Sequence, residues 1–233
     1  MTDGARPARD WRIRPAGDAA IALEFEARID PDVNARVTAA AARVEAERLR
    51  GVRDIVPSYH SVTVYVDPLR TDAGRVRAAL EEAASAPPPA ADPAREVVIP
   101  VRYGGAGGPD LGEVAAFAGC PADEVVRRHA ATLYRVYMVG YLHGFAYLGT
   151  VDPRIAMPRR PTPRLAVPAG SVGIAGAQTG VYPTAAPGGW RLIGRTTVRM
   201  FDAGRNPPGL VGPGDRVRFE PLPPGASAMG DGA

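Results

Sequence analysis

The sequence predicts an α+β protein with two domains and a short tail. Residues 1–94 form a predicted α/β domain, because strand and helix patterns follow one another in the ferredoxin-like order β-α-β-β-α-β. Residues 95–222 form a predicted β-barrel domain. From Thr150 to Gly214 the chain holds ten prolines and eleven glycines, which excludes long helices and is typical of short strands joined by turns. Residues 223–233 are small and polar and predict a disordered tail.

The elements of the first domain follow from periodicity and from capping residues. Alternating apolar residues predict a strand over 19–26. Asp30 is the predicted N-cap and Pro31 the first residue of a helix with apolar side chains as far as Val44, and Gly51 occupies its predicted C′ position. The unit is completed by strands over 52–57 and 61–67, a helix that Thr71 or Asp72 caps, and a strand over 95–101.

Two segments between the predicted elements are rich in proline or glycine. The proline-rich residues 85–93 either link the domains or form a long loop inside the first one. Glycine-rich residues 104–108 follow a strand and precede a helix, which is where a phosphate-binding loop would lie. Their spacing matches neither the dinucleotide motif nor the P-loop, and Asp110 would cap the next helix with a negative charge. We therefore predict a structural turn.

The second domain begins with helices and continues with short strands. The helices are predicted over 110–118 and 121–131. The predicted strands cover residues 164–167, 171–175, 179–182, 190–193, 197–201 and 216–219.

Composition excludes several classes of protein. No apolar run is long enough for a membrane helix, and the N-terminus has no signal-peptide pattern. The single cysteine, Cys120, excludes an internal disulfide and a multi-cysteine zinc site. We therefore predict a cytoplasmic protein without membrane contact. All 28 basic residues are arginine, so a P-loop lysine and a Schiff-base lysine are both excluded.

Charge is distributed unevenly along the chain. Residues 1–94 carry a net charge of −2 and residues 95–233 carry +5. This imbalance is too small for a nucleic-acid-binding surface, and no aromatic side chains interleave a basic stripe. It fits a second domain that binds a small anionic ligand, and a solvated surface explains it nearly as well.

The standard catalytic and metal-binding motifs are missing from the sequence, so no catalytic residue and no metal site is predicted. What remains is a set of arginines and neutral polar residues among glycines and prolines, where a rigid backbone can hold guanidinium groups ready for a carboxylate or phosphate. The candidate substrate- or anion-binding residues are Arg159, Arg164, Gln178, Thr179, Tyr182 and Arg195. Arginines scattered over surface loops explain the same pattern equally well.

Four sequence blocks carry a resemblance to a known family. They cover residues 137–149 (YMVGYLHGFAYLG), 158–183 (PRRPTPRLAVPAGSVGIAGAQTGVYP), 187–196 (PGGWRLIGRT) and 213–219 (PGDRVRF). Together they closely resemble the family of 5-oxoprolinase B subunits, also called allophanate hydrolase subunit 1 or the KipI family. The same unit, carboxyltransferase subdomain C and D, occurs in urea carboxylase. The resemblance extends over about residues 11 to 220.

The resemblance implies a fold and a function. The fold is an N-terminal α/β domain followed by a cyclophilin-like β-barrel. The function is that of a subunit that acts with subunits C and A to cleave 5-oxo-L-proline to L-glutamate, with hydrolysis of ATP used by the complex. Two alternatives stay open: a KipI-like inhibitor of a sensor histidine kinase, and an allophanate hydrolase subunit that acts on another small amide.

The sequence departs from the family pattern at two positions in and directly after the first block. His143 stands where many relatives have proline, and Thr150 replaces the second of two glycines. His143 is either an acid–base group gained near the site or a tolerated substitution in a turn.

Overall fold

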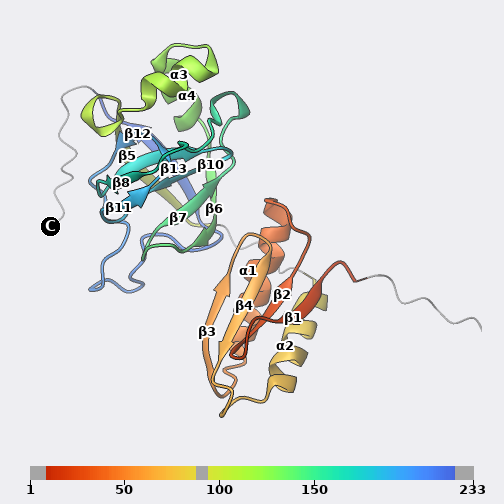
Figure 1. Ribbon diagram of the computed structural model, residues 1–233. Coiled ribbons are helices and arrows are strands. Elements are labelled where there is room, and N and C mark those ends of the chain that lie inside the picture. Colours follow the sequence, from red (N-terminus) through yellow and green to blue (C-terminus); the bar gives the residue numbers. More distant parts are fainter. Residues whose placement is uncertain (1–8, 88–93, 224–233) are drawn as a thin grey trace, which may run out of the picture. The chain divides into compact units, whose positions relative to one another are not determined.

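The computed structural model describes residues 9–87 and 94–223 (Figure 1). The chain divides into two compact units, Met1–Asp92 and Pro93–Ala233. The predicted disordered tail and most of the proline-rich segment lie outside the described residues.

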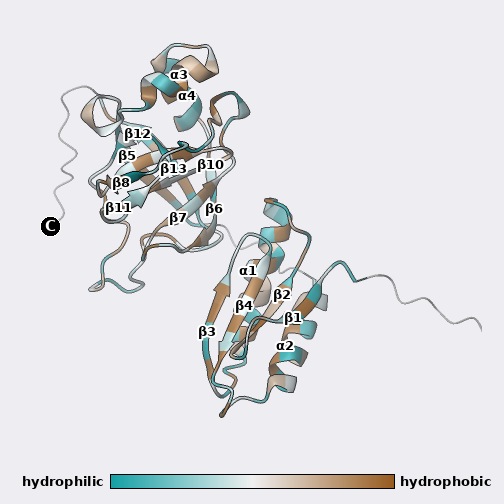
Figure 2. Ribbon diagram, viewed as in Figure 1, coloured by the Kyte–Doolittle hydropathy of each residue, from teal (hydrophilic) through white to brown (hydrophobic). Residues whose placement is uncertain are grey.

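The first unit contains a four-stranded antiparallel sheet with the order β1-β2-β4-β3 and two helices. Its elements are β1 (Arg12–Pro15), β2 (Ala20–Glu24), α1 (Pro31–Ala46), β3 (Val52–Pro57), β4 (Ser61–Val66) and α2 (Ala73–Ser85). The helices bury one face of this sheet: Leu23, Val62 and Val64 are fully buried and pack with Val37 and Leu80. The apolar stretches of β2, β3 and β4 are visible in Figure 2.

Both helices of the first unit begin at the predicted caps. The Asp30 carboxylate accepts hydrogen bonds from the backbone N–H groups of Asp32 and Val33, and Asp72 caps α2 in the same way. The predicted C′ role of Gly51 is wrong, because α1 ends at Ala46. Gly51 instead has a φ of +81° directly before β3, where an added Cβ would lie 2.1 Å from the Thr71 hydroxyl.

The strand expected to complete the first unit belongs to the second unit instead. The predicted strand over 95–101 forms as β5 (Glu96–Tyr103), but it pairs with β12 and β13. The edge strand next to β2 is β1, which was not predicted. This edge strand is mostly exposed and is held by Arg12 and Arg14, whose side chains both bind Glu24. Because two of its four residues are arginine, β1 lacks the longer run of alternating apolar residues that predicts a strand.

The second unit is built around a closed seven-stranded barrel with the order β10-β7-β6-β13-β5-β12-β9, closed by pairing of β9 with β10. This confirms the predicted β-barrel. The further strands are β6 (Tyr134–Val139), β7 (Ala146–Gly149), β9 (Ser171–Ala175), β10 (Gln178–Val181), β12 (Arg191–Arg195) and β13 (Arg216–Pro221). β13 runs parallel to β5, and the other pairs are antiparallel.

Smaller elements surround the barrel. They are η1 (Gly105–Gly107), α3 (Leu111–Ala118), α4 (Ala122–Ala130), η2 (Pro153–Ile155) and a two-stranded sheet of β8 (Arg164–Val167) and β11 (Ala186–Gly188). Strands β6, β7 and β11 were not predicted. The predicted strand over 197–201 is wrong, because that segment forms only an isolated bridge between Phe201 and Gly209.

The glycine-rich segment 104–108 forms a turn packed against β12. The Gly104 N–H donates to the Ile193 carbonyl, and a Cβ on Gly108 would lie 2.2 Å from the same oxygen. The glycines therefore allow close contact between two backbones.

Candidate functional site

Strand β10 has one face toward the interior of the barrel and one face toward the exterior. Thr179 and Val181 are fully buried, and Val181 belongs to the barrel core. Because side chains alternate along a strand, Gln178 and Gly180 face outward. A Cβ on Gly180 would lie 3.2 Å from the Trp190 ring and 2.8 Å from the Ala146 carbonyl oxygen. The outer face of β10 therefore lies directly beneath Trp190.

An aromatic cluster covers this outer face. The Phe145 ring meets the Trp190 ring edge to face at 5.3 Å, and Tyr147 meets it at 5.9 Å. Gly173 on the neighbouring strand also allows close approach, since a Cβ there would lie 3.1 Å from Trp190 Cβ. The two glycines let the indole lie flat against the barrel, where only 4% of Trp190 is exposed.

Tyr182 belongs to this cluster as a structural member. Its ring packs edge to face against Phe145 at 5.2 Å, and its hydroxyl lies beneath Gly188, where a Cβ would come within 2.3 Å. Burial raises the pKa of Tyr182 to about 12. The phenol is therefore neutral and covered, so it packs against the site rather than facing a ligand.

The loop that precedes β8 is fixed against the β11–β12 turn. The Arg160 N–H donates to the Gly189 carbonyl at 2.8 Å, and the Pro158 carbonyl accepts from Arg191 Nε at 3.2 Å. One residue earlier, the Met157 carbonyl accepts from the Gly176 N–H at 2.8 Å. The backbone on both sides of Arg159 is therefore held in place.

Asp110 anchors the side chains of the same loop. Its carboxylate is buried and accepts from the Leu192 N–H at 2.7 Å, from Arg164 at 2.7 Å and from Arg160 at 3.3 Å. The expectation that Asp110 caps the following helix through its side chain is wrong, because that side chain makes no capping bond to α3. Arg191 binds the neighbouring Glu113. Arg164 is thus committed to a buried ion pair and is not a free anion-binding fork.

Arg159 differs from its arginine neighbours. Its side chain lies over the Trp190 ring, with the guanidinium carbon 5.9 Å from the ring centroid. It is exposed and makes no hydrogen bond or ion pair with any other described residue. Burial raises the pKa of Tyr147 and of Tyr182, and the positive charge of Arg159 acts in the opposite direction on both. Arg159 therefore keeps its N–H donors available.

Inside the barrel, Thr179 belongs to a buried hydrogen-bond network. Tyr103 Oη lies 2.7 Å from His129 Nδ1, and His129 Nε2 lies 2.8 Å from Thr179 Oγ1, which donates to the Gly173 carbonyl at 2.9 Å. Since Thr179 uses its only proton on Gly173, it must accept from His129 Nε2–H, and Nδ1 accepts from Tyr103. Burial lowers the pKa of His129 to about 3, so the imidazole is neutral. Thr179 is committed to the core and has no free hydroxyl for a ligand.

The six predicted residues therefore separate into groups. Arg159 and Tyr182 lie close to Trp190. Gln178 lies on the outer face of β10, two residues before Gly180, and Arg164 is paired with Asp110. Arg195 lies at the other end of β12 from Arg191, where its Nε donates to the Ala169 carbonyl at 3.0 Å. Thr179 and Arg195 are thus not part of this surface, which we name the outer site and define by Arg159, Gln178, Tyr147 and Trp190.

Sequence reasoning missed the residues that build this surface. Asp110 was identified only as a helix cap, and its role as an anchor was missed because its partners Arg160, Arg164 and Leu192 lie 50 to 82 residues away in the chain. Trp190 could have been found, since it follows two glycines in the third family block.

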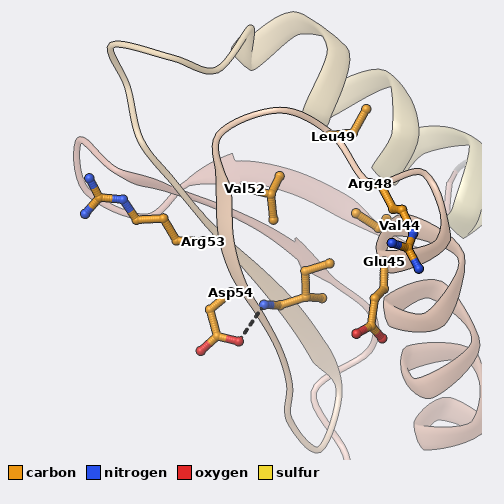
Figure 3. A pocket seen from close by; sticks show the side chains of 8 residues that line it. Val44, Glu45, Arg48, Leu49, Val52, Arg53 and Asp54 are labelled. Atoms are coloured by element: carbon orange, nitrogen blue, oxygen red, sulfur yellow. Dashed lines mark hydrogen bonds between the residues drawn. The ribbon is translucent and has the colours of Figure 1, made fainter.

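Other hollows lie elsewhere in the described part of the chain. One of about 580 Å³ is lined by residues 139–144, Phe201 and Gly209, and includes the exposed His143, whose ring lies 5.4 Å from that of Phe201. Another, of about 410 Å³, lies between the end of α1 and β3 in the first unit (Figure 3). There Asp54 accepts from the Ile55 N–H, and Arg53 points away from the other side chains. Within residues 9–87 and 94–223, no helix is long and apolar enough to cross a membrane, and no three metal-binding side chains cluster.

Comparisons with known proteins agree on one family. The family described as "Carboxyltransferase domain, subdomain C and D" matches residues 11–211. The B subunit of the 5-oxoprolinase of Bacillus subtilis (strain 168) is 40% identical over 220 residues, which cover 90% of this chain and 92% of that protein. The corresponding B subunit of Escherichia coli O157:H7 is 43% identical over 209 residues, which cover 88% and 93%.

A solved structure shares the fold. The crystal structure of TTHA0988 superimposes with a TM-score of 0.79 at 38% sequence identity over 91% of this chain. The match covers 40% of the TTHA0988 chain, so the present chain spans about two fifths of that protein.

Proposed function

Because this chain belongs to the carboxyltransferase-domain family, subdomain C and D, together with the 5-oxoprolinase B subunits, we propose that it is one subunit of an ATP-dependent 5-oxoprolinase. The observation that carries this proposal is identity of 40% and 43% to two such subunits over most of both chains. In the proposed reaction, water opens the lactam of 5-oxo-L-proline. The water oxygen enters the new carboxyl group, the C–N bond breaks, and the nitrogen gains a proton to give L-glutamate. ATP is hydrolysed to ADP and phosphate in the same cycle.

The glycine-rich turn gives no support for ATP binding by this chain. In the glycine-rich turn, the N–H groups of Gly104 and Gly108 already bind the carbonyls of Ile193 and Gly104. The sequence contains no lysine that could bind phosphates. We therefore propose that ATP binds to the partner subunits, subunits C and A. This supports a subunit that is inactive alone.

Among the described residues, the outer site is the surface that we propose for a small anion. Arg159 supplies a fork of charged donors on a fixed backbone, and Gln178 supplies a neutral amide. Charged donors aimed at a carboxylate or at a developing oxyanion are the main contribution that an enzyme surface makes to such chemistry. We propose that this surface contributes to substrate binding in the complex.

Reconstitution tests this proposal. The chain is purified alone and with subunits C and A, and glutamate release from 5-oxo-L-proline is measured with and without ATP. We expect activity only when this chain, both partners and ATP are all present. Robust activity of the chain alone, or undiminished activity of the partners without it, would overturn the proposal. Allophanate serves as a second substrate, and its hydrolysis in place of 5-oxo-L-proline would favour the other small-amide alternative.

A further inference from the structure

We infer that Asp110 is a positioning residue of the outer site. Together with Glu113, its carboxylate binds the neighbouring arginines and leaves Arg159 as the donor for a small carboxylate ligand. The inference rests on the proposed function in one respect, which is the choice of 5-oxo-L-proline as that ligand.

Asp110 joins strand β12 to the segment 158–164. Its Oδ2 atom accepts from the Leu192 N–H at 2.7 Å, and the Asp110 N–H donates to the Leu192 carbonyl at 2.9 Å. Its Oδ1 atom accepts from Arg164 at 2.7 Å and from Arg160 at 3.3 Å. Only 2% of the Asp110 side chain is exposed, so these bonds are stronger than they would be in water. One buried carboxylate therefore holds two separate parts of the chain together.

Glu113 adds a second link between the same parts of the chain. It lies in the first turn of α3 and binds Arg191, whose Nε donates to the Pro158 carbonyl at 3.2 Å. Its Oε1 atom also lies 3.9 Å from Arg160 Nη1. These paired residues form a cluster that we name the clamp and define by Asp110, Glu113, Arg160, Arg164 and Arg191. The clamp holds the segment 158–164 through both its side chains and its backbone.

Both parts of the outer site adjoin the clamp. Arg159 directly precedes Arg160, and Trp190 directly precedes Arg191. The Arg160 N–H also donates to the Gly189 carbonyl at 2.8 Å, so the two segments are bonded to each other one residue away from Arg159 and from Trp190. The Arg159 guanidinium carbon lies 5.9 Å from the centroid of the Trp190 ring. Since the clamp fixes the residue that follows each partner, it sets the position of the cation relative to the indole.

Charge pairing in the clamp is complete without Arg159. Arg160, Arg164 and Arg191 bind the two clamp carboxylates. Arg159 makes no hydrogen bond or ion pair with another described residue, although it lies in the same segment. A guanidinium group whose backbone is held in advance loses less entropy when it binds a carboxylate, to which it can donate two parallel hydrogen bonds. Asp110 thus acts on the ligand through Arg159.

A double-mutant cycle on the full reconstituted complex tests the inference, with equilibrium binding as its readout. The probes are 5-oxo-L-proline and its carboxamide, which keeps the lactam and lacks the negative charge. In the wild type, Arg159→Gln should weaken binding of the charged probe about 10- to 100-fold, the range of one charge-assisted interaction, and leave the carboxamide unchanged. Asp110→Asn keeps the size of the side chain and removes its charge. In that background the factor caused by Arg159→Gln should shrink at least about fivefold.

A purely structural role for Asp110 would give a different pattern. Loss of stability alone would weaken both probes by a similar factor in Asp110→Asn, and the effect of Arg159→Gln would stay as in the wild type. Glu113→Gln keeps the inference testable if Asp110→Asn does not fold, since 52% of the Glu113 side chain is exposed. The effect of Arg159→Gln should shrink in that variant as well, by a smaller factor.

Asp215→Asn is the matched control. The Asp215 carboxylate also binds an arginine, Arg95, at 2.8 Å and a backbone N–H, that of Gly212, at 2.9 Å. It belongs to the same unit and neither to the clamp nor to the outer site. Its replacement should leave the effect of Arg159→Gln on the charged probe unchanged.

The contrary outcomes are distinct from failure of the proposed function. An undiminished effect of Arg159→Gln in Asp110→Asn, or in Glu113→Gln where Asp110→Asn does not fold, would overturn the inference. A wild type in which Arg159→Gln leaves the charged probe unaffected would overturn it as well. Failure of the wild-type complex to release glutamate would overturn the proposed function instead. The binding factors do not depend on turnover, so they would still decide the inference.

Discussion

Gln178 and Thr179 are neighbours in the chain, but they lie in two regions with opposite properties. Thr179 points into the barrel, where every member of the Tyr103–His129–Thr179 network has a hydrogen-bond partner. Gln178 points outward, toward a surface where the Arg159 guanidinium makes no hydrogen bond or ion pair with a described residue. The comparison shows that one sequence motif serves two purposes, because a strand directs alternate side chains to opposite faces.

The two regions are also coupled through β10. The interior network ties β10 to β5 through Tyr103 and to α4 through His129, and His129 also stacks on Phe219 at 4.7 Å. A satisfied buried network specifies one arrangement of the strands around it. The interior therefore fixes the strand that presents Gln178 on the outer face.

Replacement of His129 should give the largest effect. His129→Ala removes a fully buried, stacked ring and leaves the Tyr103 and Thr179 hydroxyls without their partner. We expect the barrel unit to lose about 3–5 kcal/mol of unfolding free energy, as for other large-to-small core changes. Urea unfolding followed by Trp190 fluorescence in a Trp11→Phe background measures this loss. Gln178→Ala should change the unfolding free energy by no more than about 0.5 kcal/mol. Equal losses in the two variants would contradict the distinction between the interior network and the outer face of β10.

Lowering the pH should reduce the stability contributed by the buried His129 before it affects the carboxylates at the surface. The pKa of His129 falls from 6.5 to about 3 in the fold because burial disfavours the charged imidazole. The contribution of neutral His129 to the unfolding free energy is therefore fully present above pH 6.5. It is lost progressively as the pH falls from 6.5 toward 3. The loss is about 1.4 kcal/mol per pH unit, or about 2 kcal/mol at pH 5.

The pH window separates His129 from the carboxylates. Arginine partners lower the pKa of Glu124 and of Asp152 to about 2, so the contributions of these partly exposed groups decline only below about pH 4.5. Unfolding free energies measured between pH 7.5 and 5 should fall in the wild type and in His143→Asn, whose replaced histidine is exposed. His129→Gln should flatten this dependence. The same slope in His129→Gln as in the wild type would contradict the assignment.

Local patterns predicted much of the fold. The caps at Asp30 and Asp72 and strand β3 were correct because each depends on residues adjacent in the chain. Strand β1 was missed because arginines occupy its exposed edge, and β5 was predicted as a strand but in the first unit. Its partners β12 and β13 follow about 90 to 120 residues later, and pairing at that distance has no local signal.

The candidate site was predicted in part for the same reason. Arg159 and Gln178 belong to motifs that the sequence made visible, and the structure places both on the outer face. Thr179 was grouped with Gln178 because the strand's alternation was not applied within the motif. Arg164 was taken as a free fork because nothing in the sequence connects it with Asp110, which lies 54 residues earlier. Ion pairs between residues that are far apart in the chain could not be predicted from the sequence alone.

Replacement of single arginines in the segment that contains Arg159 and Arg164 should give the smallest changes in unfolding free energy. The two replacements can be compared directly. Arg164→Gln takes from the buried Asp110 carboxylate a partner at 2.7 Å, and only Arg160 at 3.3 Å and the Leu192 N–H then remain. About a quarter of the Arg164 side chain (23%) is exposed, so solvent reduces the cost below that of a fully buried pair, and we expect a loss of about 1–3 kcal/mol. Arg159→Gln gives up only a cation–π contact at an exposed position, which is worth at most about 1 kcal/mol. The unfolding free energies of the two variants, measured by urea unfolding at pH 7.5, should therefore differ clearly, with Arg159→Gln near the wild type. If Arg159→Gln were the more destabilising of the two, Arg159 would be part of the structural clamp, and the outer site would lose its free donor.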